Sequence, residues 1–241
     1  MKKSKRSVAR WLLTSVCLSV LTVILQACGG SPPSGSSSAP FPLVAVATTE
    51  APGIQVETQE PLFADDFSNP LSGWNVRRDA DAVTDYQIGE FVIYVGKVNT
   101  TLWSIPNHYL ADVNVDVDAR EAAGPDDNLF GVICRYQDSD NFYRFVIGGN
   151  GFAGITKRAA GQVIVLSGVN LERSPAVNKG QTSNHLKVIC SGTQLSLYVN
   201  DQLVAQATDP DFQGGDVGLL ASTGAHPGVE IHFTNFLVTQ P

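Results

Sequence analysis

Polar and apolar residues alternate with a period of two through much of the chain after Pro61. The clearest run is 112–118, where three valines alternate with acidic and amide residues, a pattern typical of a strand with one buried face. Similar runs between Gly-, Asn- and Asp-rich turns predict strands at 90–95, 131–136, 142–147, 161–166, 185–190, 195–199, 217–220 and 229–238. No segment sustains an amphipathic helical pattern over three turns. We therefore predict that residues 61–241 form an all-β jelly-roll sandwich of two antiparallel sheets.

The first 27 residues have the pattern of an export signal. Five basic residues lie among the first ten, and the apolar run 11–27 is shorter than the ~20 residues of a spanning helix. Leu25-Gln26-Ala27-Cys28 resembles the lipobox of bacterial lipoproteins, in which the cysteine is acylated after cleavage. We expect residues 1–27 to be a lipoprotein signal peptide and Cys28 to carry the lipid. The alternative is a plain secretory signal with an incidental cysteine.

Residues 28–60 follow as a lipidated cysteine and a flexible linker. Residues 29–38 are almost entirely Gly, Ser and Pro, and no Lys or Arg occurs between positions 29 and 60. A flexible chain of this length spans about 30 Å, enough to separate a domain from a membrane surface. Together with the lipid, this predicts a cell-envelope location, with the domain anchored to the membrane and facing outside the cytoplasm.

The charge argues against nucleic acid as a partner. The chain has 16 Lys and Arg against 23 Asp and Glu, a net charge of −7, and without the basic signal segment the balance becomes −12. Such a surface repels phosphate backbones and gains nothing from counterion release.

Several motifs of the strand-rich part are similar to those of the concanavalin A-like lectin/glucanase superfamily. They are Asp65-Asp66-Phe67-Ser68 with Gly73-Trp74, the run from Gly131 to Asp138 followed by Asn141-Phe142-Tyr143-Arg144-Phe145, and Tyr198-Val199-Asn200-Asp201, Gly215-Asp216-Val217-Gly218-Leu219 and Phe233-Thr234-Asn235-Phe236. The nearest branches are laminin-G-like domains and the 3-keto-disaccharide hydrolase family. The resemblance implies a jelly roll over residues 61–240, with a role in glycan binding, glycan cleavage or adhesion.

The two cysteines left in the exported domain are expected to pair. Cys134 shares a strand face with Val132 and Tyr136, and Cys190 shares one with Leu186 and Val188; both faces are expected to point into the core. The alternative is two separate buried thiols.

Alternation also predicts which side chains point outward. With Val113, Val115 and Val117 inside, Asp116 and Asp118 point out; Arg135 and Arg144 are expected outside and opposite each other, with the two aspartates on an adjoining strand. Adding Tyr198 and Trp103 gives one polar-aromatic face suited to carbohydrate, because aromatic rings stack on sugar C–H groups while arginine and carboxylate groups bind hydroxyls. The alternative is a solvated charge ladder over an ordinary sheet.

Acidic loops at Asp65/Asp66, Asp126–Asn128 and Asp138–Asn141 offer the hard oxygen ligands that calcium prefers. Asp and Asn also form turns for purely structural reasons. We expect this structural role and no cofactor; a structural calcium, which the superfamily often has, is the alternative.

Catalytic motifs are absent from the sequence. The domain has four glutamates, none in the Glu-x-Asp-x-x-Glu array of related β-glucanases, and no His-Glu-x-x-His or Gly-x-Ser-x-Gly motif occurs. We therefore expect a surface lipoprotein that binds polysaccharide rather than an enzyme. The alternatives are a glycoside-cleaving hydrolase of the 3-keto-disaccharide type and a structural adhesion domain without a small ligand.

Overall fold

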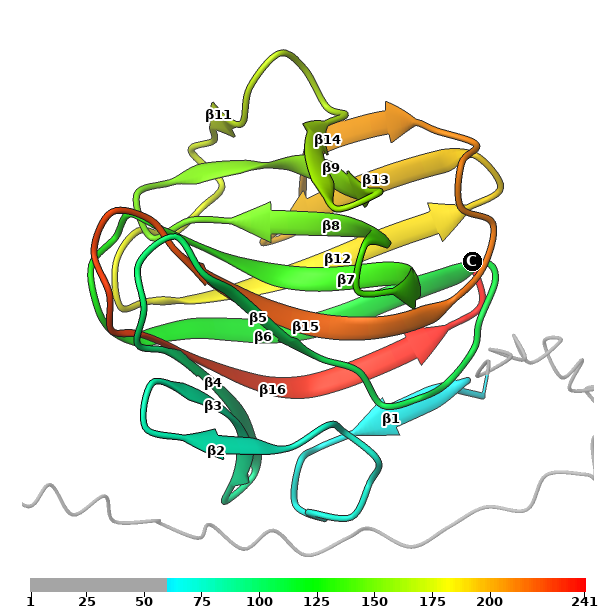
Figure 1. The fold of residues 1–241 in the computed structure, drawn as a ribbon. Coiled ribbons are helices and arrows are strands. Elements are labelled where there is room, and N and C mark those ends of the chain that lie inside the picture. Colours follow the sequence, from blue (N-terminus) through cyan, green and yellow to red (C-terminus); the bar gives the residue numbers. More distant parts are fainter. Residues whose placement is uncertain (1–59) are drawn as a thin grey trace, which may run out of the picture. The chain divides into compact units, whose positions relative to one another are not determined.

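The structure, a computed structural model, describes residues 60–241, which form sixteen β-strands and no helix (Figure 1). The expected signal peptide, the lipid site Cys28 and the linker up to residue 59 lie outside the described residues. Within the described part, no helix is long and apolar enough to cross a membrane.

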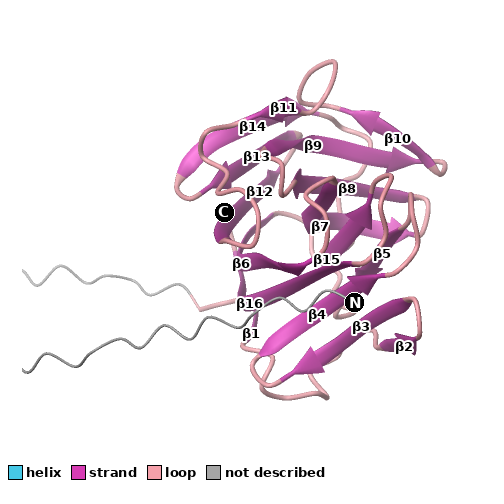
Figure 2. Ribbon diagram, turned by 90° about the vertical axis from the view of Figure 1, so that its left-hand side faces the viewer, coloured by secondary structure: helices cyan, strands magenta, loops and turns pink. Residues whose placement is uncertain are grey.

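The strands form two antiparallel sheets that pack face to face (Figures 1 and 2). The nine-stranded sheet has the order β14 (Gln202–Thr208), β13 (Gln194–Val199), β12 (Ser183–Ser191), β6 (Val113–Ala123), β16 (Val229–Thr239), β4 (Glu90–Val95), β3 (Ala82–Gln87) and β2 (Arg77–Asp79), with β1 (Phe63–Asp65) paired to β16. The seven-stranded sheet has the order β10 (Gln162–Val165), β9 (Phe152–Ala159), β8 (Asn141–Ile147), β7 (Asn128–Asp138), β15 (Asp216–Thr223) and β5 (Thr101–Ser104), with β11 (Glu172–Arg173) paired to β9.

The main core lies between the two sheets and is built by alternation. In β6 every second residue from Val113 to Ala119 is buried, and the residues between them are partly exposed. Leu186 and Val188 of β12 lie directly opposite Val117 and Val115 of β6, so the apolar sides of neighbouring strands coincide. The prediction of a two-sheet, all-β sandwich is confirmed.

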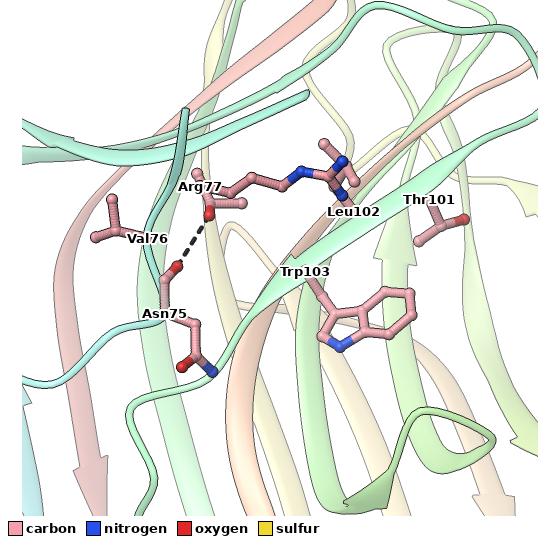
Figure 3. A pocket seen from close by; sticks show the side chains of 7 residues that line it. Asn75, Val76, Arg77, Thr101, Leu102 and Trp103 are labelled. Carbon is pink, nitrogen blue, oxygen red and sulfur yellow. Dashed lines mark hydrogen bonds between the residues drawn. The ribbon is translucent and has the colours of Figure 1, made fainter. Parts of the chain in front are cut away.

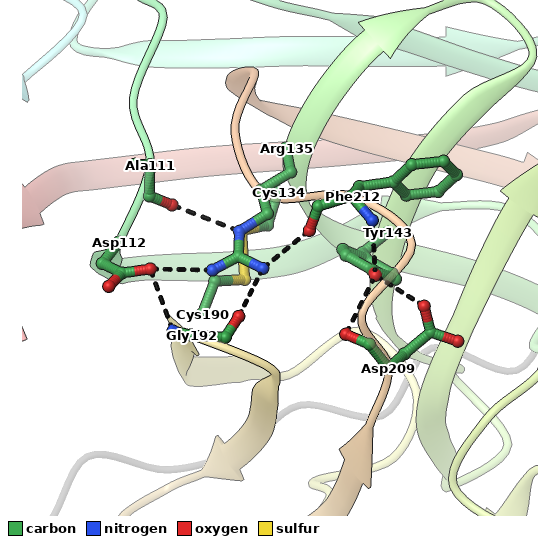
Figure 4. The surroundings of a disulfide bond; sticks show 9 residues. All are labelled: Ala111, Asp112, Cys134, Arg135, Tyr143, Cys190, Gly192, Asp209 and Phe212. Atoms are coloured by element: carbon green, nitrogen blue, oxygen red, sulfur yellow. Dashed lines mark hydrogen bonds and ion pairs between the residues drawn. A yellow bond between two sulfur atoms is a disulfide. The ribbon is translucent and has the colours of Figure 1, made fainter.

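A disulfide between Cys134 of β7 and Cys190 of β12 links the two sheets across the core (Figure 4). Both cysteines are fully buried in the main core. The expected pairing is therefore confirmed.

The two sheets differ on their outward sides. The strands β6 and β16 alternate between buried and partly exposed residues, whereas β8 and β15 are buried on both sides. The cause is a second apolar cluster on the outward face of the seven-stranded sheet, formed by Ile133, Phe142, Val146 and Leu220, with Trp103, Leu129, Tyr136 and Leu171 packed against them. We call this surface the outward face of the seven-stranded sheet.

Candidate functional site

The six residues expected on one binding face are divided among three places. Asp116 and Asp118 lie on β6 and Tyr198 on β13, so all three belong to the nine-stranded sheet. Trp103 on β5 and Arg144 on β8 lie on the outward face of the seven-stranded sheet. The prediction of a single shared face is wrong, because the strands that carry these residues belong to opposite layers of the sandwich.

Arg135 does not point outward but is buried, with 1% of its surface exposed. Its φ angle of 53° places it in the left-handed region, and the β7–β8 register shifts between Cys134 and Asp138. This bulge also turns Tyr136 away from the main core, against our expectation, and into the outward cluster. Arg144 consequently lies opposite Ile133, and the predicted Arg135–Arg144 pair does not form.

The buried guanidinium of Arg135 joins three loops beside the disulfide (Figure 4). Its nitrogens donate hydrogen bonds to the carbonyl oxygens of Ala111, Gly192 and Phe212, at 3.2, 2.7 and 2.7 Å, and to Asp112 Oδ1 at 2.8 Å. Four of its five N–H donors are thus used inside the protein, which makes Arg135 a structural residue.

Asp116 and Asp118 are bonded to a histidine that the sequence analysis did not assign. His185 of β12 lies with Nδ1 2.9 Å from Asp118 Oδ1 and with Nε2 3.3 Å from Asp116 Oδ1. Burial lowers the pKa of His185, but the hydrogen bonds and charges of the two aspartates outweigh burial, so the pKa is raised above its ordinary value. This cluster is an internally paired charge group on the nine-stranded sheet.

Three aromatic rings form a continuous row on the outward face of the seven-stranded sheet. The ring centroid of Phe142 lies 5.6 Å from that of Trp103 and 5.3 Å from that of Tyr136. Phe142 is fully buried, whereas Trp103 and Tyr136 are partly exposed at the two ends of the row. Phe142 therefore supports two rings that remain accessible to a ligand.

A hollow of about 300 Å³ lies beside Trp103, between β2 and β5 (Figure 3). Asn75, Val76, Arg77 and Thr101 contribute to its wall, which combines apolar, hydroxyl, amide and guanidinium groups. This mixture of groups can contact both the faces and the hydroxyls of a sugar.

A second hollow, of about 250 Å³, lies beside Tyr136 at the other end of the row, with Tyr109, Gln137 and Asp216 in its wall. Burial raises the pKa of the Asp216 carboxyl, while the backbone N–H groups of His108, Val217 and Asn107 act in the opposite direction. A third hollow, of about 270 Å³, is lined by Leu129, Phe152, Leu171 and Ser222, among others. The row of rings is thus bordered by concave surface.

Arg144 lies on the same face, two residues from Phe142 along β8. It is 6% exposed, and its Nε has no hydrogen-bond partner among the described residues. Burial, together with the nearby charge of Arg158, lowers the pKa of Arg144 to about 10, so the guanidinium is still charged at neutral pH.

The acidic loops considered for calcium are bonded within the protein. Asp138 accepts hydrogen bonds from the backbone N–H of Asp140 and the side-chain amide of Asn141, and Asp127 accepts one from the N–H of Ala225. Residues 60–241 contain no group of three or more His, Cys, Asp or Glu side chains placed to hold a metal. Calcium binding stays a prediction.

The aromatic row was only partly accessible to sequence reasoning. Trp103 and Arg144 were singled out, but Phe142 was not assigned to the site and Tyr136 was placed in the core. The period-two pattern of β8 puts Phe142 and Arg144 on one side. The bulge in β7 that places Tyr136 on the same side as Phe142 and Arg144 is not indicated by any sequence pattern that we used.

Comparison with known proteins concerns the fold. No protein-family model and no curated protein matches the sequence. Among solved structures, the chain is similar to carbohydrate-binding module CBM66 from Bacillus subtilis, with 17% identity, a TM-score of 0.55, and coverage of 70% of this chain and 96% of that chain. It is also similar to a protein of unknown function with a galectin-like fold from Bacillus subtilis, with 11% identity, a TM-score of 0.56, and coverage of 75% and 96%.

A third similar structure is a family 43 glycoside hydrolase protein from Bacillus licheniformis, with 13% identity and a TM-score of 0.56, where the match covers 74% of this chain but 39% of the other. At these identities the likeness extends to the arrangement of strands and not to site residues. The described part of the chain therefore has a jelly-roll sandwich of the kind found in galectin-like folds and carbohydrate-binding modules.

Proposed function

We propose that this protein is a lipid-anchored protein of the cell envelope whose β-sandwich binds polysaccharide on the outward face of the seven-stranded sheet. The observation that carries the proposal is the row formed by Trp103, Phe142 and Tyr136, with a hollow at each end. Aromatic rings at the surface of a rigid sheet offer flat apolar area to the C–H faces of sugars at little entropic cost.

The fold supports a carbohydrate ligand. Proteins with similar structures include one described as a carbohydrate-binding module and one described as a glycoside hydrolase, although fold alone does not fix function. The Lys- and Arg-poor composition of the chain fits a neutral or weakly charged glycan better than a nucleic acid.

Binding is favoured over hydrolysis by the distribution of carboxyl groups. A glycosidase of the common type needs two carboxyls about 5–9 Å apart in a cleft. Asp216 is the only carboxyl in the wall of the hollow beside Tyr136, and the wall of the hollow beside Trp103 has none.

The proposal is tested by exposing the detergent-solubilised full chain to a glycan panel and recording both retention and the release of reducing sugar. We expect retention without release. Trp103→Ala should weaken binding at least about tenfold, or ~1.4 kcal/mol, because it removes one accessible ring of the row.

The matched control is Tyr198→Ala, which removes a partly exposed aromatic side chain from the nine-stranded sheet. This variant should bind like the unaltered protein. Loss of binding in Tyr198→Ala with full retention in Trp103→Ala would refute the assignment of the face. Steady release of sugar would favour the hydrolase, and no retention of any glycan would favour a structural adhesion domain.

A further inference from the structure

Three polar groups on the outward face of the seven-stranded sheet have no hydrogen-bond partner among residues 60–241. They are Arg144 Nε on β8, and Thr156 Oγ1 and Arg158 Nε on β9. Each of these atoms is buried from solvent. Arg144 and Thr156 lie directly opposite each other across the β8–β9 pair, and Arg158 lies opposite Phe142, one step along the same face. The three groups therefore belong to one patch.

All three groups can donate a hydrogen bond, and two of them belong to cations. Asp140 lies 3.4 Å from Arg158, but among the described residues no ion pair involves Arg144. Burying a charged guanidinium to 6% exposure without an ion-pair partner costs free energy. Proteins retain buried, unpaired polar groups of this kind mainly at functional sites, where a ligand can offset the unfavourable free energy.

The group that complements three donors on one side of neighbouring strands is an acceptor with negative charge. A carboxylate fits best, because the planar guanidinium can bind both of its oxygens in parallel while a hydroxyl and a second arginine complete its shell.

The patch is also narrow. The Cβ that a side chain would add at Gly154 on β9 would lie 2.6 Å from Leu171 Cδ2 and 2.9 Å from Ser167 Oγ, so the 167–171 segment closes this side of the face.

The position of the patch connects it to the aromatic row. Arg144 is two residues from Phe142 on the same face of β8, a separation of about 7 Å along a strand. This is on the scale of one sugar unit, so a sugar whose carboxylate reaches Arg144 can place its ring, or its neighbour's ring, against the row.

The total charge limits the ligand further. With 23 acidic and 16 basic residues, the chain repels a densely charged polymer. One carboxylate held by one buried arginine patch suits a single acidic sugar, either at a chain end or within a largely neutral glycan.

We propose, on the basis of the binding function proposed above, that Arg144, Thr156 and Arg158 form a subsite for the carboxylate of a hexuronate in the bound polysaccharide. Arg144 supplies the paired donors, and Thr156 and Arg158 complete the contact with the carboxylate oxygens. The neighbouring rings select for a sugar over a free organic acid.

The test compares oligosaccharides of galacturonate and of glucuronate with their methyl esters, using calorimetry on the detergent-solubilised full chain. The ester keeps the sugar ring and removes the charge. We expect at least one acid form to bind tenfold or more tightly than its ester. Arg144→Gln should bring this ratio close to one while changing the affinity for the ester less than twofold.

The control is Arg78→Gln, which removes an arginine with 68% of its side chain exposed from β2 and should leave the ratio unchanged. If Arg144→Gln does not fold, Arg144→Lys, which keeps the charge but cannot bind both oxygens in parallel, should still reduce the ratio. The acid–ester comparison on the unaltered protein needs no variant.

Equal binding of acid and ester, with loss of both in Trp103→Ala, would overturn the carboxylate subsite and leave the proposed function standing. Absence of binding to any oligosaccharide, charged or neutral, would overturn both. Stronger competition by inorganic phosphate or by sulfated sugars than by uronates would refute the choice of a carboxylate. Acetate that binds as tightly as the uronates would refute the role of the sugar ring.

Discussion

At the scale of single residues, Arg135 shows how one backbone angle changes a side chain's role. Strict alternation places Arg135 on the outer surface, but its positive φ angle inserts a bulge and turns the guanidinium toward three carbonyl groups. The burial of Val113, Val115 and Val117 was predicted correctly because β6 keeps a regular period over this run. A bulge depends on what the neighbouring loops offer, which a local pattern does not contain.

We expect Arg135→Ala to lower the free energy of unfolding by about 3 kcal/mol, because it leaves buried carbonyl groups without a donor. The melting temperature should fall by roughly 6–12 °C for a domain of this size. Arg78→Ala, at an exposed position, should change it by less than about 2 °C. A melting temperature for Arg135→Ala within the range of this control would refute the structural role.

Glu121 is a buried carboxyl whose two oxygens both lack a hydrogen-bond partner among the described residues. Burial raises the pKa of Glu121, the nearby side-chain amide of Asn128 lowers it, and the charge of Asp126 raises it, with a net shift upward. Between the unfolded and the folded pKa, the carboxyl therefore binds a proton more strongly in the folded protein than in the unfolded chain. The protonated Glu121 carboxyl contributes its full stabilisation of the fold below the unfolded pKa, near 4.5. This stabilisation is lost as the pH rises through the folded pKa.

We therefore expect Glu121→Gln to melt at least ~2 °C above the unaltered protein at pH 7, because glutamine fills the same space without a charge. At pH 4 the two proteins should melt at nearly the same temperature. Melting curves at both pH values provide the measurement, with the exposed Glu172→Gln as the control. A difference in melting temperature between the two proteins that is larger at pH 4 than at pH 7 would contradict this expectation.

At the scale of elements, the disulfide joins β7 of one sheet to β12 of the other. Its two cysteines are 56 positions apart in the sequence. Closing a loop of this length stabilises a fold by about 4 kcal/mol in the chain-entropy account. The pairing was predictable because both strands have regular patterns up to the cysteine.

We expect the double variant Cys134→Ala/Cys190→Ala to melt roughly 8–16 °C below the oxidised protein. Reductant should lower the melting temperature of the unaltered protein by a similar amount and should not affect the double variant. If thiol titration shows that the protein is fully reduced and its melting temperature is still unchanged, this expectation is wrong.

The predicted strands are correct, including those in β8 and β15 that are buried on both sides, but the set is incomplete. All nine period-two runs correspond to strands, including β6, β12 and β16. The sequence analysis missed β9, because Gly154, Lys157 and Arg158 interrupt the apolar pattern that it relied on. It also missed β1, β2, β3, β5, β11 and β14. Of these, β2 and β14 are edge strands with mostly exposed or partly exposed residues and therefore little apolar contrast.

At the scale of the whole molecule, the assignment of strands to sheets could not be derived from local patterns. Residues 112–118 and 131–136 are close in the sequence, yet they lie in opposite sheets, while β6 pairs with the distant β12 and β16. Long-range pairing decides which outward residues share a surface. For this reason the six predicted site residues were separated, although the inward or outward direction was predicted correctly for most of them.

The expected lipid anchor is also a property of the whole chain. Cys28→Ala should move the protein from the membrane fraction to the soluble fraction of the envelope, because a protein without acyl chains at this position has no durable hold on a bilayer. Fractionation followed by immunoblotting measures this change. Thr48→Ala, in the same linker, is the control, and continued membrane association of Cys28→Ala would argue against lipidation.

The pairing of β1 with β16 brings the first described strand beside the last one, with the N–H of Leu62 donating to the carbonyl of Val238 at 2.8 Å (Figure 1). Both strands belong to the nine-stranded sheet, the layer opposite the aromatic row. A fluorescent reporter fused after Pro241 would emerge next to the chain's own entry point. Such a fusion would leave the layer with the aromatic row unobstructed, and it is the arrangement that we favour for labelling the protein.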